Sequence, residues 1–144
     1  MLDSDRITNN RHFVTRNMAD ILLSTLNARY IHTAFGLRYL YANLGELQAR
    51  AKIEEFTIHQ RPVDIVEKLL KQNPRIVCFG VYIWNAEEVS ETVALIKQIS
   101  PETLIVIGGP EVSHAPDLPA FAELADYIIE GAGEISLRKL CTQL

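Results

Sequence analysis

The chain has 144 residues, of which 48% are hydrophobic and 22% are charged. This composition is typical of one globular domain with a sizeable core. The formal net charge is −4 and no block of basic residues occurs, which argues against a nucleic-acid or anionic-membrane surface. No apolar run reaches the ~18 to 20 residues that a membrane-spanning helix requires. The two cysteines, Cys78 and Cys141, have neither disulfide-framework nor metal-ligand spacing, so we expect a protein of the reducing cytoplasm.

The first 18 residues show neither helical nor strand periodicity, and they lack the apolar centre of a secretory signal. We therefore expect an irregular leader over 1–18 and one folded domain over 19–144. The last predicted helix begins only a few residues before Leu144. We expect the chain to be the front part of a longer protein.

Apolar runs and apolar residues at helical spacing alternate along the rest of the chain. The runs predict strands at 21–23, 53–58, 75–82, 104–107 and 127–129. The helical spacing predicts helices at 33–48, 62–70, 85–99 and 120–124, and one after Glu134. Asn85 suits the N-cap of its helix, with Glu88 completing a capping box.

Strands that alternate with helices through short links predict a parallel sheet with right-handed crossovers. Five such units predict an α/β fold: a flavodoxin-like, doubly wound, five-stranded parallel sheet with helices on both faces, Rossmann-like in character. The run at 75–82 is almost continuously apolar, which is typical of a strand covered on both sides.

Chemically distinctive residues follow four of the predicted strands. These segments are 27–32, 82–85, 108–114 and 131–134. In a parallel sheet all four strand ends lie at the carboxyl edge, where open α/β sheets bind their ligands. The sequence therefore predicts a broad ligand surface there. Each segment also has an ordinary interpretation, since aromatic residues pack under helices and glycines form turns.

Familiar catalytic patterns are absent from the sequence. It contains no Gly-x-Ser-x-Gly elbow, no Walker-type loop and no dinucleotide fingerprint. No two histidines have metal-ligand spacing. Glu111, Glu130 and Glu134 lie in loops and suit hydrogen bonding to a ligand better than acid–base catalysis. We assign no catalytic residue and no metal ligand.

Four motifs together carry a family resemblance. They read Asn-Ala-Arg-Tyr-Ile-His from Asn27, Val-Tyr-Ile-Trp-Asn from Val81, Gly-Gly-Pro-Glu-Val-Ser from Gly108 and Glu-Gly-Ala-Gly-Glu from Glu130. With them the chain resembles the N-terminal cobalamin-binding domain of B12-dependent radical SAM proteins, in the branch that includes the anaerobic Mg-protoporphyrin cyclase type. The resemblance extends over about residues 19–140.

The resemblance implies that the corrin of cobalamin lies flat over the carboxyl edge, on a floor that glycines keep low. It implies a radical SAM domain as the partner, following in the same parent chain. The cofactor-binding residues that it implies are Asn27, Arg29, Tyr30, His32, Tyr82, Ile83, Trp84, Asn85, Gly108, Gly109, Pro110, Glu111, Ser113, Gly131, Gly133 and Glu134. The last three would hold the corrin side chains or the nucleotide tail.

Two departures from related families limit what the chain does alone. The Asp-x-His-x-x-Gly motif, whose histidine ligates cobalt in mutases, is absent, so we expect Tyr, Trp or water below the cobalt. The Cys-x-x-x-Cys-x-x-Cys motif is also absent. S-adenosylmethionine and a four-iron four-sulfur cluster would belong to the remainder of the parent protein, and this chain would not be catalytic by itself.

Two other functions stay open. The domain could be a ligand-free, flavodoxin-like docking module of a radical SAM protein. It could also bind a flavin or nucleotide, because the Gly131–Glu134 turn opens a helix whose amides could hold a phosphate. The second alternative is weakened by the missing phosphate loop.

Overall fold

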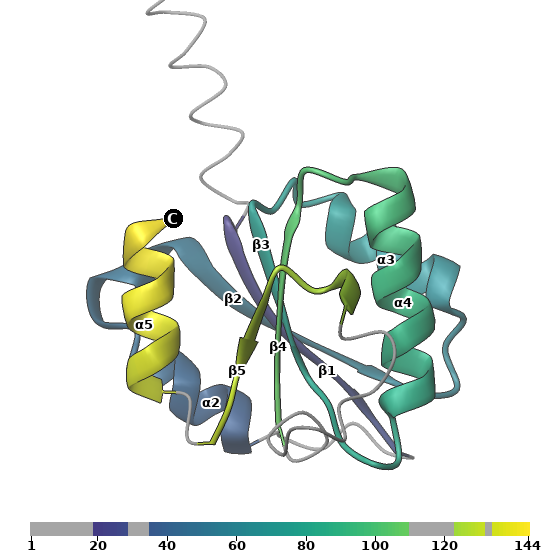
Figure 1. The fold of residues 1–144 in the computed structure, drawn as a ribbon, viewed down its shortest axis with the longest axis horizontal. Coiled ribbons are helices and arrows are strands. Elements are labelled where there is room, and N and C mark those ends of the chain that lie inside the picture. Colours follow the sequence, from purple (N-terminus) through teal and green to yellow (C-terminus); the bar gives the residue numbers. More distant parts are fainter. Residues whose placement is uncertain (1–18, 29–34, 110–122, 132–133) are drawn as a thin grey trace, which may run out of the picture.

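A computed structural model describes residues 19–28, 35–109, 123–131 and 134–144. They form a five-stranded parallel sheet of order β2-β1-β3-β4-β5 (Figure 1). The strands are β1 (Ile21–Asn27), β2 (Ala51–Thr57), β3 (Ile76–Gly80), β4 (Leu104–Gly108) and β5 (Tyr127–Ile129). The predicted flavodoxin-like fold is confirmed, while the leader predicted over 1–18 lies outside the described residues.

Two helices cover each face of the sheet (Figure 1). The helices are α2 (Phe35–Ala42), α3 (Pro62–Leu70), α4 (Ala86–Ile99) and α5 (Glu134–Gln143). Successive residues of β1 point to opposite faces, so Leu23 packs with Leu37 of α2, whereas Leu22 packs with Val93 of α4. Within the described ranges, no helix is both long and apolar enough to cross a bilayer.

The helix predicted over 33–48 is divided in the structure. Helix α2 ends at Ala42, and a 3-10 helix, η1 (Gly45–Arg50), leads into β2. Gly45 has a φ of 61°, which is outside the range of a right-handed helix and reverses the chain. Leu44 is fully buried, so the apolar spacing of the sequence continues across the break between α2 and η1. Only Gly45 indicated that break.

Several smaller predictions differ from the structure. Strand β1 runs to Asn27 rather than ending at residue 23, and β3 ends at Gly80 rather than at residue 82. Strand β2 begins at Ala51 rather than at residue 53. Ile99 fits the apolar spacing of the helix predicted over 85–99, but it is 59% exposed at the last position of α4. Of the helix predicted over 120–124, the described part is a single helical turn at 123–124.

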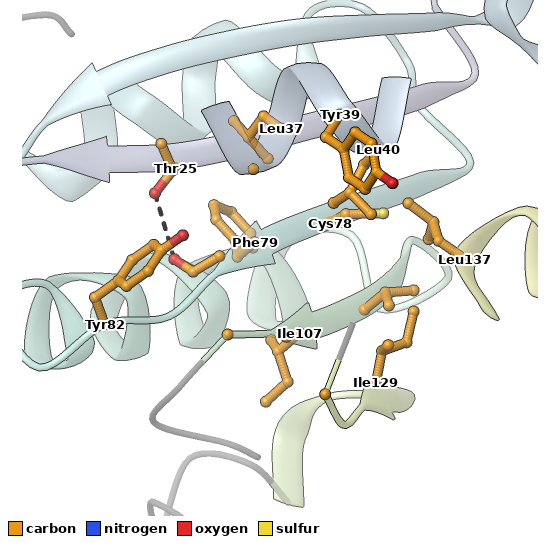
Figure 2. A pocket seen from close by; sticks show the side chains of 16 residues that line it. Thr25, Leu37, Tyr39, Leu40, Cys78, Phe79, Tyr82, Ile107, Ile129 and Leu137 are labelled. Atoms are coloured by element: carbon orange, nitrogen blue, oxygen red, sulfur yellow. Dashed lines mark hydrogen bonds between the residues drawn. The ribbon is translucent and has the colours of Figure 1, made fainter. Parts of the chain in front are cut away.

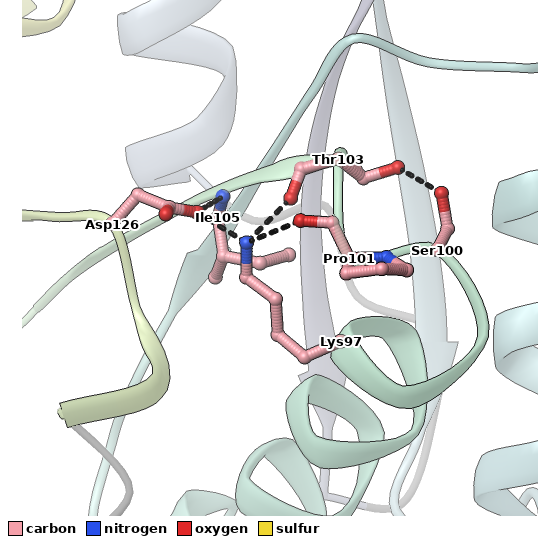
Figure 3. Close-up of polar contacts among 6 residues, drawn as sticks. All are labelled: Lys97, Ser100, Pro101, Thr103, Ile105 and Asp126. Carbon is pink, nitrogen blue, oxygen red and sulfur yellow. Dashed lines mark hydrogen bonds and ion pairs between the residues drawn. The ribbon is translucent and has the colours of Figure 1, made fainter.

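A cluster of polar contacts fixes the start of the three-residue edge strand β5 (Figure 3). Asp126 Oδ2 lies 2.6 Å from Lys97 Nζ and accepts the Ile105 backbone N–H at 2.8 Å. Lys97 Nζ also donates to the Thr103 carbonyl at 2.8 Å. The Lys97 and Asp126 side chains are 17% and 31% exposed, so solvent screens the pair only partly. The cluster joins α4, β4 and β5.

We expect Asp126→Ala to lower the free energy of unfolding by about 2 kcal/mol, because a charge-assisted bond is lost and Lys97 and Ile105 lose an acceptor. Asp64, which pairs with Arg61 at 2.8 Å on the surface of α3, is the matched control. Asp64→Ala should cost much less than Asp126→Ala, because solvent screens an exposed pair. Urea denaturation followed by circular dichroism measures both, and equal losses would contradict the anchoring role of Asp126.

Candidate functional site

The fold creates a crevice at the carboxyl ends of β1 and β3. After β1 the chain passes over one face to the edge strand β2, with α2 on that face, whereas after β3 it passes through α4 over the other face to β4. The connections that follow the adjacent strands β1 and β3 therefore leave toward opposite faces of the sheet. Open α/β sheets bind ligands at such a point.

A cavity of about 250 Å³ lies at this edge, between α2, α5 and the ends of β1, β3, β4 and β5 (Figure 2). Its walls are mostly apolar side chains and glycines, including Leu37 and Leu40 of α2, Ile129 of β5 and Leu137 of α5. Among the described residues that line it, none carries a charge. The cavity therefore suits an apolar group rather than a phosphate or carboxylate.

The glycines at this edge have different roles. A Cβ on Gly109, whose φ is 111°, would lie 2.5 Å from the Val81 carbonyl oxygen. Val81 also donates its N–H to the Gly108 carbonyl at 2.7 Å, so Gly109 lets the exits of β3 and β4 pack together. Gly131 has a φ of 69° and no atom within 4 Å of its Cβ position. A side chain at Gly131 would therefore meet open space.

Residues Tyr82 to Asn85 form a turn. Asn85 donates its N–H to the Tyr82 carbonyl at 3.1 Å, and Tyr82 donates its N–H to Asn85 Oδ1 at 2.8 Å. The turn stacks the Tyr82 and Trp84 rings, with centroids 4.5 Å apart and planes 6° apart. Ile83 and Trp84 are 80% and 49% exposed. An aromatic pair and an exposed aliphatic side chain thus stand at the carboxyl edge.

Asn85 occupies the N-cap position of α4, as predicted, but its fully buried side chain makes no cap hydrogen bond, so the predicted capping box is wrong. Its Nδ2 donates to the Leu26 carbonyl at 3.0 Å and to the Gly80 carbonyl at 3.3 Å. Thr25 Oγ1 lies 3.4 Å from the same nitrogen. One amide therefore connects the ends of β1 and β3 to the aromatic turn.

The other predicted residues are distributed as follows. Asn27, at the end of β1, donates to Glu55 Oε1 at 3.2 Å and does not line the cavity. Gly108, Gly109, Gly131 and Tyr82 do line it. Glu134 begins α5, but its side chain is not described. Arg29, Tyr30, His32, Pro110, Glu111, Ser113 and Gly133 lie outside the described residues.

Sequence reasoning missed the helical walls of the cavity. No site role was predicted from the sequence for Gly36, Leu37, Leu40 or Leu137, yet all four line the cavity. A glycine inside a helical pattern usually has a packing or functional reason. Gly36 was therefore the one available signal in the sequence.

The two cysteines lie in the core cluster beneath α2 and α5. Burial, and then the nearby Cys141, raises the pKa of the Cys78 thiol well above its usual range. Burial also raises the pKa of Cys141, against an opposing effect of Arg50. Both thiols are mostly protonated near neutral pH, so neither is an activated nucleophile and both react slowly with electrophiles. Within the described ranges, no three His, Cys, Asp or Glu side chains gather as metal ligands.

The sequence profile of the B12 binding domain family matches residues 21–140. The chain belongs to this family. It is 31% identical over 90 residues to the 2-(S-pantetheinyl)-carbapenam-3-carboxylate methyltransferase of Streptantibioticus cattleyicolor. It is equally similar to the cobalamin-dependent radical SAM methyltransferase TokK of Streptomyces tokunonensis. Each alignment takes in 56% of this chain and 13% of the relative. The resemblance expected from the four motifs is thereby confirmed.

Two solved structures share the fold of this B12-binding domain. A cobalamin-binding protein from Desulfitobacterium hafniense DCB-2 matches 88% of this chain and 59% of that one, with 21% identity and a TM-score of 0.61. OxsB, a cobalamin-dependent S-adenosylmethionine radical enzyme with aqua-cobalamin bound, matches 92% of this chain and 20% of that one. Its identity is 20% and its TM-score 0.68. At these identities the likeness concerns the fold.

We expect Gly109→Ala to lower the free energy of unfolding by more than about 3 kcal/mol, because a strained φ adds to an overlap with the Val81 backbone. Gly131→Ala is the control, since Gly131 also has a positive φ, at 69°, but nothing lies within 4 Å of its Cβ position. It should cost about 1 kcal/mol. Urea denaturation compares the two, and similar losses would show that backbone strain alone explains Gly109.

We expect Asn85→Ala to cost about 3 kcal/mol, because buried partners on β1, β3 and the turn lose their bonds together. Asn43→Ala removes a hydrogen bond on the surface, from the Asn43 side-chain amide to the Tyr39 carbonyl. It should cost about 1 kcal/mol or less. The fluorescence of Trp84, the single tryptophan, should change on Asn85→Ala and stay constant on Asn43→Ala. An unchanged spectrum for Asn85→Ala would contradict the conclusion that the Asn85 side chain fixes the position of the turn.

Proposed function

We propose that this domain binds cobalamin and serves as the cobalamin-binding part of a radical SAM enzyme. The observation that carries the proposal is an uncharged cavity at the carboxyl edge of a B12-binding domain. The names of TokK and OxsB support the enzyme class. The chain spans only 13% of its curated relatives, so the activity of the whole protein is part of the proposal.

The cavity is large enough for only a part of cobalamin. Its volume of about 250 Å³ is below the ~300 to 1,000 Å³ of pockets that enclose drug-sized ligands. We propose that the larger corrin ring lies outside the cavity, over the loops that follow β3 and β4. The nucleotide tail of cobalamin ends in a small, planar, apolar base, and the apolar walls suit that part. We propose that the base occupies the cavity.

The described residues suit these tasks to different degrees. Trp84 and Ile83 are exposed at the edge and would contact the corrin. Gly108, Gly109 and Gly131 line the cavity, and Gly131 would let a ligand approach its backbone. We propose that Tyr82, Trp84 or water, and no histidine, lies below the cobalt. Asn27 and Asn85 would support this surface from inside. Further proposed contacts are Arg29, Tyr30, His32, Pro110, Glu111, Ser113, Gly133 and Glu134.

Bound cobalamin would supply a cobalt centre that can carry a methyl group. S-adenosylmethionine and the four-iron four-sulfur cluster would be held by a C-terminal radical SAM domain of the parent protein. This chain would hold the corrin at its carboxyl edge, where that domain can reach it. The second candidate function, docking without a cofactor, is favoured by the 80% exposure of Ile83, which a partner surface could cover.

Titration of the chain with hydroxocobalamin tests the proposal. We expect the visible corrin bands to shift, the cofactor to co-elute in gel filtration and the Trp84 fluorescence to fall. Trp84→Ala should weaken binding about tenfold, because an aromatic contact is lost. Ile99→Ala, an exposed position at the end of α4, should leave the affinity unchanged. Absence of both band shift and co-elution would reject cobalamin binding and leave the docking function.

A further inference from the structure

Tyr82 lies against two glycines at the side of the cavity. A Cβ on Gly80, at the end of β3, would be 3.4 Å from Tyr82 Cε2, and a Cβ on Gly36, in α2, would be 3.6 Å from the Tyr82 hydroxyl. The ring therefore lies within contact distance of both the end of β3 and α2. A methyl group at either glycine position would touch the ring at an ordinary contact distance, and only a larger side chain would displace it.

The backbone and the side chain of Tyr82 are held by different contacts. Two hydrogen bonds to Asn85 fix the backbone. The ring is held by stacking on Trp84, which is itself half-exposed. Within the described residues, the Tyr82 hydroxyl has no hydrogen-bond partner. Because the backbone and the ring are held by separate contacts, a rotation about the side-chain bonds of Tyr82 would move the ring without breaking either hydrogen bond to Asn85.

We propose that the Tyr82 ring is a gate that controls access to the cavity, with Trp84 as the surface that holds it closed. When the ring lies over Gly36 and Gly80, it closes the side of the cavity toward the β1–β3 crevice. When it leaves Trp84, that side opens. The gate deepens the proposed function, and it rests on that function only for the identity of the ligand that enters.

Cys78 provides a reporter inside the cavity. Its side chain lines the cavity and is 5% exposed. A small uncharged thiol reagent such as N-ethylmaleimide must enter the cavity before it can react there. The experiment uses the full chain with Cys141→Ala, so that one cysteine remains. Mass spectrometry follows the rate of labelling in native conditions.

We expect Tyr82→Ala to speed the labelling of Cys78 by about fivefold or more, the factor expected when an aromatic contact is lost. Trp84→Ala removes the surface that holds the ring and should also speed labelling. Tyr82→Phe keeps the stacked ring and loses only the hydroxyl, so its rate should equal that of the parent chain. Trp84→Ala keeps the test valid if Tyr82→Ala fails to fold.

A destabilised control separates gating from unfolding. Val66→Ala truncates a buried residue of α3, on the opposite face of the sheet, and lowers stability without touching the cavity. If it speeds labelling as much as Tyr82→Ala at equal loss of stability, the gate is rejected. The gate is also rejected if Tyr82→Phe labels as fast as Tyr82→Ala, or if neither Tyr82→Ala nor Trp84→Ala changes the rate.

The same assay with hydroxocobalamin present separates the gate from the proposed function. Protection of Cys78 by the cofactor supports entry of part of cobalamin into the cavity. Faster labelling in Tyr82→Ala without any protection in the parent chain supports the gate and counts against cobalamin as the ligand. Protection with no effect of Tyr82→Ala or Trp84→Ala supports the ligand and rejects the gate.

Discussion

The arrangement of the carboxyl edge depends on the buried amide of Asn85. Its nitrogen donates to carbonyl groups at the ends of β1 and β3, and its oxygen accepts the N–H of Tyr82. Adjacent parallel strands are joined by backbone bonds along their length, but at the switch point the chains diverge and that pairing ends. Beyond the last backbone hydrogen bonds, the side-chain amide of Asn85 continues the connection between β1 and β3. It thereby fixes where the aromatic turn stands relative to both central strands.

The cavity follows from the unequal sizes of the residues on the two faces of the sheet. The face under α3 and α4 is filled by large side chains such as Phe56 and Phe79. On the other face β3 presents Cys78 and Gly80 beneath α2 and α5. Protein cores are close-packed, so small residues on one face either draw the helices inward or leave a space. Here Gly36, Cys78 and Gly80 all line the same part of the carboxyl edge, and a space remains.

The sequence predicted the sheet well because buried parallel strands are short, continuous apolar runs, as in β3 and β4. It also placed four distinctive loops at one edge, since parallel strands all end there. It could not predict the role of Asn85, whose position before a helix is equally typical of an N-cap. Nor could it show that Gly36 and Gly80 lie against the same ring, because that contact joins residues 44 positions apart. Hydrophobic periodicity in a sequence indicates which residues are buried. A cavity depends on which small residues come together in the fold, and periodicity does not show that.

The absence of charge from the described cavity lining determines how a ligand can be held there. Apolar walls provide affinity in proportion to the surface that they cover, and they distinguish ligands mainly by size and shape. In such a site, the position of the ring that completes the wall matters more than any single polar contact. Tyr82 is that ring, since it lies between β3 and α2 and is fixed only through Trp84 and its own backbone. Closure of the cavity and exposure of the aromatic surface are therefore two states of one side chain.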